Sequence, residues 1–245
     1  MKDQEIKKIV KESYSKIAKN EGSCCTCSCK KNDQEKIAKM IGYSNEELKT
    51  PGNLGLGCGN PTALANIKTG DIVLDLGSGA GFDCFLASKR VGKTGKVIGV
   101  DMTPEMIKKA NDNIKKYNYK NVEFKLGEIE NLPIENNSID IIISNCVINL
   151  SPNKQKAFKE SHRVLKKTGK MYVSDIVLLG ELTNEQKNNP DLLSGCVAGA
   201  LQKQDYLDII KHAGFKVNIL SEDKSISKTQ YQGINLESLK LEITK

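Results

Sequence analysis

The chain has 245 residues, a formal net charge of +7 and a hydrophobic fraction of 38%. That length suits one α/β domain with additions. The positive charge comes almost entirely from lysine, because Arg90 and Arg163 are the only arginines, and side chains that read phosphates or base edges are therefore scarce. No apolar run reaches the roughly eighteen residues that span a bilayer, and the polar start does not resemble a signal peptide. We therefore expect a cytoplasmic protein that binds neither nucleic acid nor membrane.

The cysteine content is unusual for a chain expected in the cytoplasm. Thiols stay reduced in that compartment, so this placement favours soft-ion binding or catalysis over disulfides. The eight cysteines are Cys24, Cys25, Cys27, Cys29, Cys58, Cys84, Cys146 and Cys196.

The first segment carries apolar residues at helical spacing from Ile6 to Ile17, with Tyr14 among them, which predicts an amphipathic helix lying on another surface. Four cysteines follow between positions 24 and 29, and then a polar helical pattern to about Leu48. The cysteine cluster fits a soft-metal clip, a pair of redox-active thiols or unstructured loop residues of no consequence.

A glycine-rich loop surrounds Cys58 and precedes a short helix, for which Asn60 is the expected N-cap and Pro61 the first residue. Glycines on both sides of the cysteine place its sulfur next to bare backbone. The loop lies just before the first predicted strand, where a segment can fold over a ligand site as a lid. The alternative is a small buried residue in a tight loop.

Residues 72–76 predict a strand buried on both faces, which ends at a loop with Gly77, Gly79 and Gly81, and a helix should open near Phe82. Such glycines let the backbone turn sharply and approach a ligand, while the following helix N-terminus favours an anion. A second strand, 96–101, ends in Asp101 about twenty residues later, where a carboxylate can accept from both ribose hydroxyls.

The loop departs from the dinucleotide fingerprint because Phe82 stands where the third glycine would be. The stretch D-L-G-S-G-A-G instead resembles the first motif of class I S-adenosylmethionine-dependent methyltransferases, in which the loop holds the methionine carboxylate. A plain strand-to-helix turn without a ligand is the alternative.

Strands and helices then alternate as in a doubly wound fold. We expect strands at 122–126, 139–144 and 170–177, a helix capped by Thr103-Pro104 and a helix capped by Ser151-Pro152 that runs through Leu165. A helix at 203–213 should end at Gly214, and strands at 215–220 and 236–243 form a closing antiparallel hairpin.

Cys146 follows the fourth strand, next to the first strand, where the strand order of such a sheet reverses and ligands bind. We therefore predict Cys146 at the cofactor's reactive end, with a packed core thiol as the alternative. Small residues surround Cys196 much as they surround Cys58, whereas Cys84 lies inside a predicted helix, where packing is its expected role.

Several stretches together resemble the arsenite S-adenosylmethionine methyltransferases. They are the Cys24-Cys25 pair after an amphipathic helix, G-C-G-N-P at 57–61, D-L-G-S-G-A-G at 75–81, D-M-T at 101–103, S-N-C-V-I-N-L at 144–150 and S-G-C-V-A-G-A at 194–200. Two departures are Ser15, where family members commonly have glycine, and Leu56, where an aromatic residue is frequent.

The resemblance implies a Rossmann-like, mostly parallel seven-stranded sheet with an N-terminal helical lid. It divides the chain into a cysteine-rich lid segment (1–55), a cofactor-binding core with the Cys196-bearing insertion (56–215) and closing strands of the same sheet (216–245). Cys58, Cys146 and Cys196 would hold As(III), and Cys24 or Cys25 would take part in thiol exchange. The implied cofactor site consists of Gly57, Asp75, Gly77, Ser78, Gly79, Gly81, Asp101, Met102, Gly127, Glu128, Ile129 and Asn145. Within it, the backbone near Ile129 and the Glu128 side chain would meet the adenine.

The expected activity is methyl transfer from S-adenosylmethionine to arsenite, a detoxification reaction. Three thiolates suit a soft ion and leave a lone pair on arsenic that can attack the methyl group without a general base. This agrees with His162 and His212 lying on predicted helices away from the strand ends. A thiol reductant, thioredoxin or glutathione, would reset the N-terminal thiols. We expect a monomer.

Two other functions fit the same residues. One keeps the fold and methylates a small organic acceptor, with the cysteines incidental. The other is a non-enzymatic thiol protein that binds metalloids.

Overall fold

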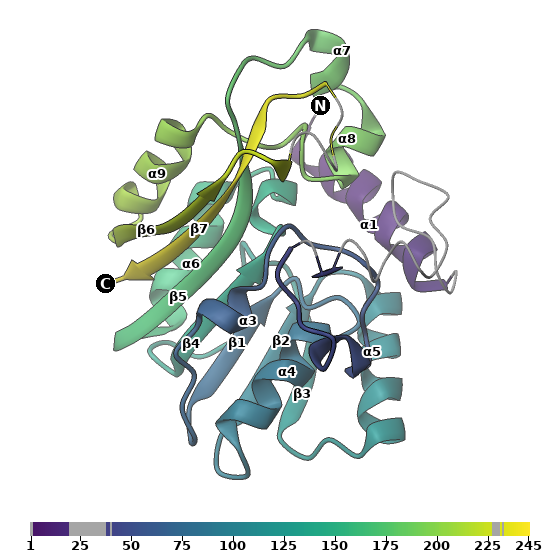
Figure 1. Cartoon of the computed structure of the whole chain (residues 1–245), viewed down its shortest axis with the longest axis vertical. Coiled ribbons are helices and arrows are strands. Elements are labelled where there is room, and N and C mark those ends of the chain that lie inside the picture. Colours follow the sequence, from purple (N-terminus) through teal and green to yellow (C-terminus); the bar gives the residue numbers. More distant parts are fainter. Residues whose placement is uncertain (1, 20–37, 40, 227–230, 232) are drawn as a thin grey trace.

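The structure is a computed structural model that describes residues 2–19, 38–39, 41–226, 231 and 233–245. Its centre is a seven-stranded sheet in the order β3-β2-β1-β4-β5-β7-β6 (Figure 1). The strands are β1 (Ile72–Leu76), β2 (Lys96–Asp101), β3 (Val122–Leu126), β4 (Ile139–Asn145), β5 (Leu165–Leu178), β6 (Lys216–Asp223) and β7 (Leu236–Thr244). The first five pair in parallel, and β7 runs antiparallel to both β5 and β6. The predicted class I methyltransferase sheet is confirmed.

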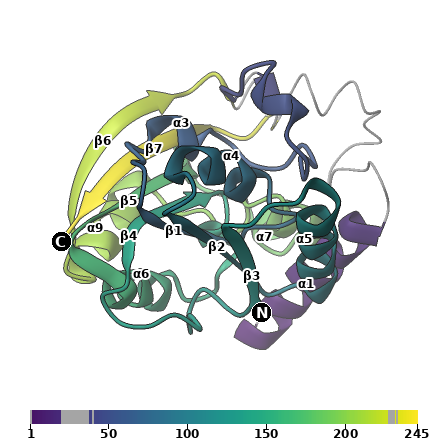
Figure 2. The same ribbon diagram turned by 90° about the horizontal axis from the view of Figure 1, so that it is seen from below.

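Helices cover both faces of the sheet, as its two-sided hydrophobicity requires. On one face lie α3 (Pro61–Leu64), α4 (Phe82–Val91) and α5 (Pro104–Tyr117), and on the other lie α6 (Lys154–Val164) and α9 (Lys203–His212) (Figure 2). Strand residues alternate between these layers: Val73 packs with Phe85 of α4, whereas Leu74 packs in the cluster that contains Phe158 of α6.

The remaining helices lie around the carboxyl ends of the strands. They are α1 (Asp3–Lys19), η1 (Glu47–Lys49), η2 (Ile148–Leu150), α7 (Asn184–Lys187) and α8 (Pro190–Ser194). Helix α1 buries Val10 and Ile17, so the predicted amphipathic helix is present and its apolar stripe packs inward. Among the described residues, no helix is long and apolar enough to cross a membrane.

Some boundaries differ from those the sequence predicts. Helix α6 begins at Lys154 with Asn153 as its N-cap, because the Asn153 side chain accepts from the Lys156 N–H, while the Ser151 hydroxyl instead donates to Glu130. Strand β5 begins at Leu165, which the sequence assigned to the preceding helix, rather than at Lys170, since an irregularity in its register with β4 lets pairing start earlier.

The predicted helical pattern up to Leu48 is confirmed only at residues 38–39, which are helical, and is wrong beyond them. Residues 41–46 form turns and irregular backbone, followed only by the short η1. Gly42 adopts a φ of 108°, and the Tyr43 hydroxyl is held by Asp83. Tertiary contacts here override the local helical pattern.

We expect Phe158→Ala to lower the free energy of unfolding by about 3–5 kcal/mol, because it empties a fully buried site. The lost ring also packs edge-on against Tyr206, with ring centroids 5.8 Å apart. Chemical denaturation measures the change. Leu126→Ala is the control, since Leu126 is 55% exposed and should shift stability by less than about 0.5 kcal/mol. Equal effects of the two substitutions would contradict the assignment of this core.

Candidate functional site

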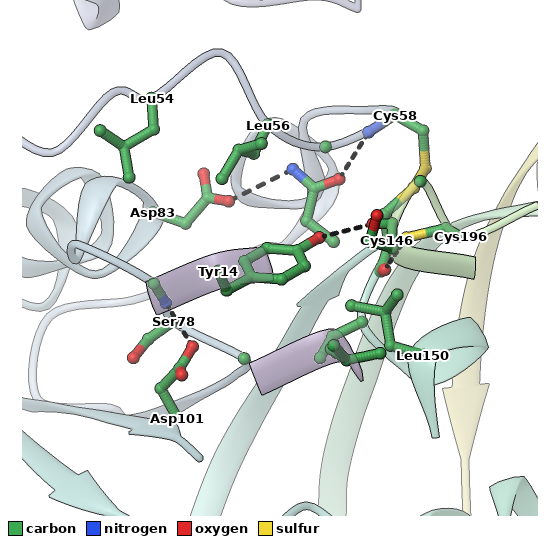
Figure 3. A pocket seen from close by; sticks show the side chains of 18 of the residues that line it. Tyr14, Leu54, Leu56, Cys58, Ser78, Asp83, Asp101, Cys146, Leu150 and Cys196 are labelled. Carbon is green, nitrogen blue, oxygen red and sulfur yellow. Dashed lines mark hydrogen bonds between the residues drawn. A yellow bond between two sulfur atoms is a disulfide. The ribbon is translucent and has the colours of Figure 1, made fainter. Parts of the chain in front are cut away.

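A cavity of about 460 Å³ lies at the carboxyl ends of β1, β2 and β4 (Figure 3). Helix α1, the segment 52–58, the glycine loop after β1 and the end of α8 also line it. Most of the predicted site residues border this space: Gly57, Cys58, Asp75, Gly77, Ser78, Gly79, Asp101, Met102, Gly127, Ile129, Asn145, Cys146 and Cys196. Gly81 and Glu128 do not.

The glycine loop is built by positive φ angles at Gly77, Gly79 and Gly81. A side chain at Gly77 would collide with Val147, and one at Gly81 would collide with two phenylalanine rings, so packing alone requires glycine at these two positions. At Gly79, in contrast, a Cβ would meet open space. Gly81 therefore shapes the loop without lining the cavity.

Asp101 closes the other side of this loop. Its carboxylate accepts hydrogen bonds from the backbone N–H of Gly79, at 2.9 Å, and of Thr103, at 2.8 Å. Burial raises the pKa of this carboxyl group, and the two backbone hydrogen bonds act in the opposite direction. The two halves of the predicted nucleoside site are thus in direct contact.

Three cysteines from distant parts of the chain converge at the far end of the cavity. Cys58 and Cys146 form a disulfide with their Cα atoms 6.0 Å apart, and the Cys196 thiol donates to the carbonyl oxygen of Cys146 at 2.7 Å (Figure 3). The expectation that all the thiols are reduced is wrong for this pair, whose Cα separation falls in the range that permits a disulfide.

The backbone at two of these cysteines is strained. Cys146 has a φ of 58° and Cys196 a φ of 68°, a left-handed conformation that residues with a Cβ rarely adopt. Such outliers are concentrated at functional sites, where the surrounding structure over-determines the backbone. The amino-acid sequence gives no signal for them, because both positions hold a residue other than glycine or asparagine.

Asn145 connects the cysteine end of the cavity with the wall near the glycine loop. Its side-chain oxygen accepts from the Cys58 N–H at 3.0 Å, and its amide donates to the Gly59 carbonyl at 2.8 Å and the Tyr43 hydroxyl at 3.1 Å. The same amide lies 3.4 Å from Asp83. One side chain at the end of β4 therefore holds the Cys58 loop beside Cys146.

Sequence reasoning missed a buried carboxylate behind the cysteines. One oxygen of Asp175 lies within 4.8 Å of the sulfurs of Cys58 and Cys146. Asn149 and Tyr206 both donate to this carboxylate, and burial raises its pKa to about 7. Its position inside an apolar strand, Leu165–Leu178, offered no local signal.

Cys84, predicted to have a packing role, also makes a hydrogen bond. Its thiol donates to the Asp75 carboxylate at 3.2 Å, and both groups are buried.

An ion-pair cluster that the sequence did not indicate lies at the residues predicted to meet the adenine, around Glu128 and Ile129. Glu128 forms an ion pair with Lys7 of α1, at 2.6 Å, and Lys7 also reaches Glu130, at 3.2 Å. Glu130, rather than Glu128, lines the cavity. Burial is the largest influence on the Lys7 pKa and lowers it, but hydrogen bonds and charges from the two glutamates outweigh it, and the pKa is raised.

The segment before α3 covers the glycine loop. A side chain at Gly52 would collide with the Ala80 carbonyl, and Leu54 and Leu56 line the cavity beside Tyr14 of α1 (Figure 3). The Tyr14 hydroxyl donates to the Ser194 carbonyl at 3.3 Å, which ties α1 to α8. Cys24, Cys25, Cys27 and Cys29 lie outside the described residues.

Comparison with known proteins identifies the family. A model of the methyltransferase domain matches residues 67–214. The arsenite methyltransferase of Halobacterium salinarum is 43% identical over 91% of this chain, and that of Homo sapiens is 35% identical over 88%. The solved arsenic(III) S-adenosylmethionine methyltransferase of Chlamydomonas reinhardtii is 32% identical, with a TM-score of 0.68 over 85% of this chain and 73% of that one.

The chain belongs to the arsenite methyltransferase family. It spans 60% of the length of the Halobacterium protein and 59% of the human one. Other solved methyltransferases, such as one from Aquifex aeolicus at 24% identity and a TM-score of 0.58, share the fold.

For this arsenite methyltransferase family member we expect Asn145→Asp to lower the free energy of unfolding by about 2–3 kcal/mol. The new carboxylate cannot donate to Gly59 and would lie beside Asp83. Urea denaturation at neutral pH measures the loss. Asn184→Asp, the same change at an exposed position, should have little effect. If the two variants were equally stable, the role of Asn145 as the connector would be refuted.

Proposed function

We propose that this protein transfers the methyl group of S-adenosylmethionine to trivalent arsenic. The observation that carries the proposal is the meeting of Cys58, Cys146 and Cys196 in the same cavity as the glycine loop and Asp101. The proposed nucleoside site and the proposed soft ligands would then be adjacent, as transfer from one to the other requires.

The residues present fit S-adenosylmethionine at the glycine-loop end. The Ser78 hydroxyl is buried at the cavity wall and has no hydrogen-bond partner in the described part of the chain, and the space above Gly79 is open. Asp101 would accept from the ribose hydroxyls, with Met102, Gly127 and Ile129 beside the base. When bound, S-adenosylmethionine supplies an electrophilic methyl group.

The three cysteines would hold arsenite at the other end. Each thiol displaces one hydroxyl group of arsenite as water, and the product is a pyramidal As(III) with three sulfur ligands. The Cys58–Cys146 disulfide must first accept two electrons and two protons, because a disulfide sulfur has no thiolate to offer. A thiol reductant is therefore part of the proposal.

Acid–base catalysis has no part in this scheme. The arsenic lone pair attacks the methyl carbon, so no proton has to leave the nucleophile. In agreement, the described residues that line the cavity include no histidine. His162 packs against Phe215, and His212 ends α9.

Repeated turnover would need the thiols near the N-terminus. After methyl transfer arsenic is formally pentavalent, and its return to As(III) requires two electrons, which two thiolates supply as they form a disulfide. We assign one of these thiols to Cys24 or Cys25, and thioredoxin or glutathione would then reduce the disulfide. The reaction would serve arsenic detoxification in the cytoplasm by a monomeric enzyme.

We expect the purified protein, given arsenite, S-adenosylmethionine and a thiol reductant, to form methylated arsenic that chromatography with elemental detection identifies. Omission of the reductant should abolish the product, because the disulfide blocks two ligands. Cys146→Ser should lower the rate by at least about 100-fold, yet retain calorimetric binding of S-adenosylhomocysteine. Full activity of this variant would refute thiolate-bound arsenic and favour an organic acceptor.

The double substitution of Cys24 and Cys25 by serine should separate transfer from turnover. A single round of transfer to prebound arsenite should remain within about twofold of wild type, because the three proposed ligands are intact. Multiple turnovers with thioredoxin or glutathione should fall steeply. Unchanged multiple turnover would dismiss the assigned role of these two cysteines.

A further inference from the structure

Asp175 has no part in the proposed arsenite chemistry, yet it lies at the two linked cysteines. One of its carboxylate oxygens and the sulfurs of Cys58 and Cys146 all lie within 4.8 Å of one another, and all three residues are buried. The Cys146 N–H donates to the carbonyl oxygen of Ser174, the residue before Asp175, at 2.9 Å, so the backbone holds this arrangement. In the described part of the chain, no other group of three cysteine, histidine, aspartate or glutamate side chains comes together in this way.

The Asp175 carboxylate can accept one further partner. It accepts three hydrogen bonds, from the Asn149 amide at 2.8 Å, the Tyr206 hydroxyl at 2.9 Å and the Ile176 N–H at 3.2 Å. A carboxylate has about four lone-pair positions, so these donors leave one of them. Hydrogen bonds of this kind orient the side chains that bind metal ions in proteins. Asp175 is therefore oriented like a metal ligand, beside two sulfurs.

The ligand types indicate a divalent cation of intermediate softness. Mg²⁺ and Ca²⁺ prefer oxygen ligands and As(III) prefers sulfur, whereas Zn²⁺ binds thiolate and carboxylate in the same site. A tetrahedral zinc ion with ordinary bond lengths holds its ligand atoms about 3.5–3.8 Å apart. Once the disulfide is reduced, its sulfurs can separate, and small side-chain movements would bring the three groups to these distances.

The charge around the three groups also fits zinc. Two thiolates and a carboxylate exceed the charge of Zn²⁺ by one negative charge. The ammonium group of Lys154, which is 9% exposed, lies nearby. Burial is the largest influence on the Lys154 pKa and lowers it, while the charges of Asp175 and Cys196 act in the opposite direction. A buried cation at this place would offset the excess negative charge.

We propose that Cys58, Cys146 and Asp175 form a Zn²⁺ site when the disulfide is reduced, with water from the cavity as the fourth ligand. The thiol reductant supplies two electrons and two protons to the disulfide, and zinc then displaces the two thiol protons while Asp175 binds as the carboxylate. The ion occupies two of the three proposed arsenite ligands, so zinc and arsenite exclude each other. Zinc binding itself does not depend on methyl transfer.

The test measures zinc binding by competition with a chromophoric chelator, in full-length protein reduced with a phosphine. Other thiols must not compete, so serine replaces Cys24, Cys25, Cys27 and Cys29 in every sample. In this background Asp175→Asn should raise the Kd for zinc by about 100-fold, because one ligand of the ion is lost. Asp112→Asn, the same change at an exposed position, should leave the Kd within about twofold.

Cys196→Ser distinguishes the zinc site from the proposed arsenite site. The Cys196 thiol bonds to the Cys146 carbonyl and is not a ligand in the zinc site, so its loss should leave the Kd for zinc within about twofold. Binding of arsenite should weaken, since one of its three proposed ligands is gone. A loss of zinc binding in Cys196→Ser, or an unchanged Kd in Asp175→Asn, would overturn the zinc site.

X-ray absorption at the zinc edge covers the case in which Asp175→Asn does not fold. Without a substitution at Asp175, the spectrum should show two sulfurs at about 2.3 Å and oxygen ligands at about 2.0–2.2 Å. Three sulfurs, or none, would overturn the assignment.

Excess arsenite added to the zinc-loaded protein should release the ion. Zinc and arsenite bound together would overturn the shared use of Cys58 and Cys146. If zinc showed the expected ligands but arsenite did not bind, the proposed function would fail and the zinc site would be supported.

Discussion

The arrangement of the site depends on the side-chain amide of Asn145. The Cys58 N–H and the Gly59 carbonyl both bond to this one residue, which itself stands at the end of a parallel strand. The strand is fixed by its neighbours β1 and β5, so the amide transfers the rigidity of the sheet to a loop without regular structure. Because the same amide touches Tyr43 and Asp83, the sulfur cluster and the cavity wall near the glycine loop share one support.

The part of the fold that the sequence predicts is the part set by local patterns. Buried strands, the loop with glycines at alternate positions and Asp101 at the end of the second strand are each visible within a few residues. Parallel strand order then follows from the handedness and short connections of such units. Such local patterns predict Cys146 at the reversal of strand order, and they correctly predict Asn60 as a helix cap.

What the sequence could not predict arises from contacts between distant segments. Tyr43 meets Asp83 across 40 positions, and Tyr206 meets Asp175 across 31, and neither pair leaves a periodic signal. The same holds for the turns at 41–46, where the hydrogen bond from Tyr43 to Asp83 of α4 fixes the backbone in place of a helix. Local preference sets the elements, and burial of polar groups decides which of them are bent or shortened to satisfy a distant partner.

The left-handed backbone at Cys146 and Cys196 means that backbone strain accompanies the sulfur atom at these two positions. Glycine at either position would relieve the strain of the positive φ, by up to about 1 kcal/mol, but it would remove a sulfur that lines the cavity and, at Cys146, the disulfide. A cysteine in such an unfavourable geometry is what the proposed role of these sulfurs as ligands would require of the fold.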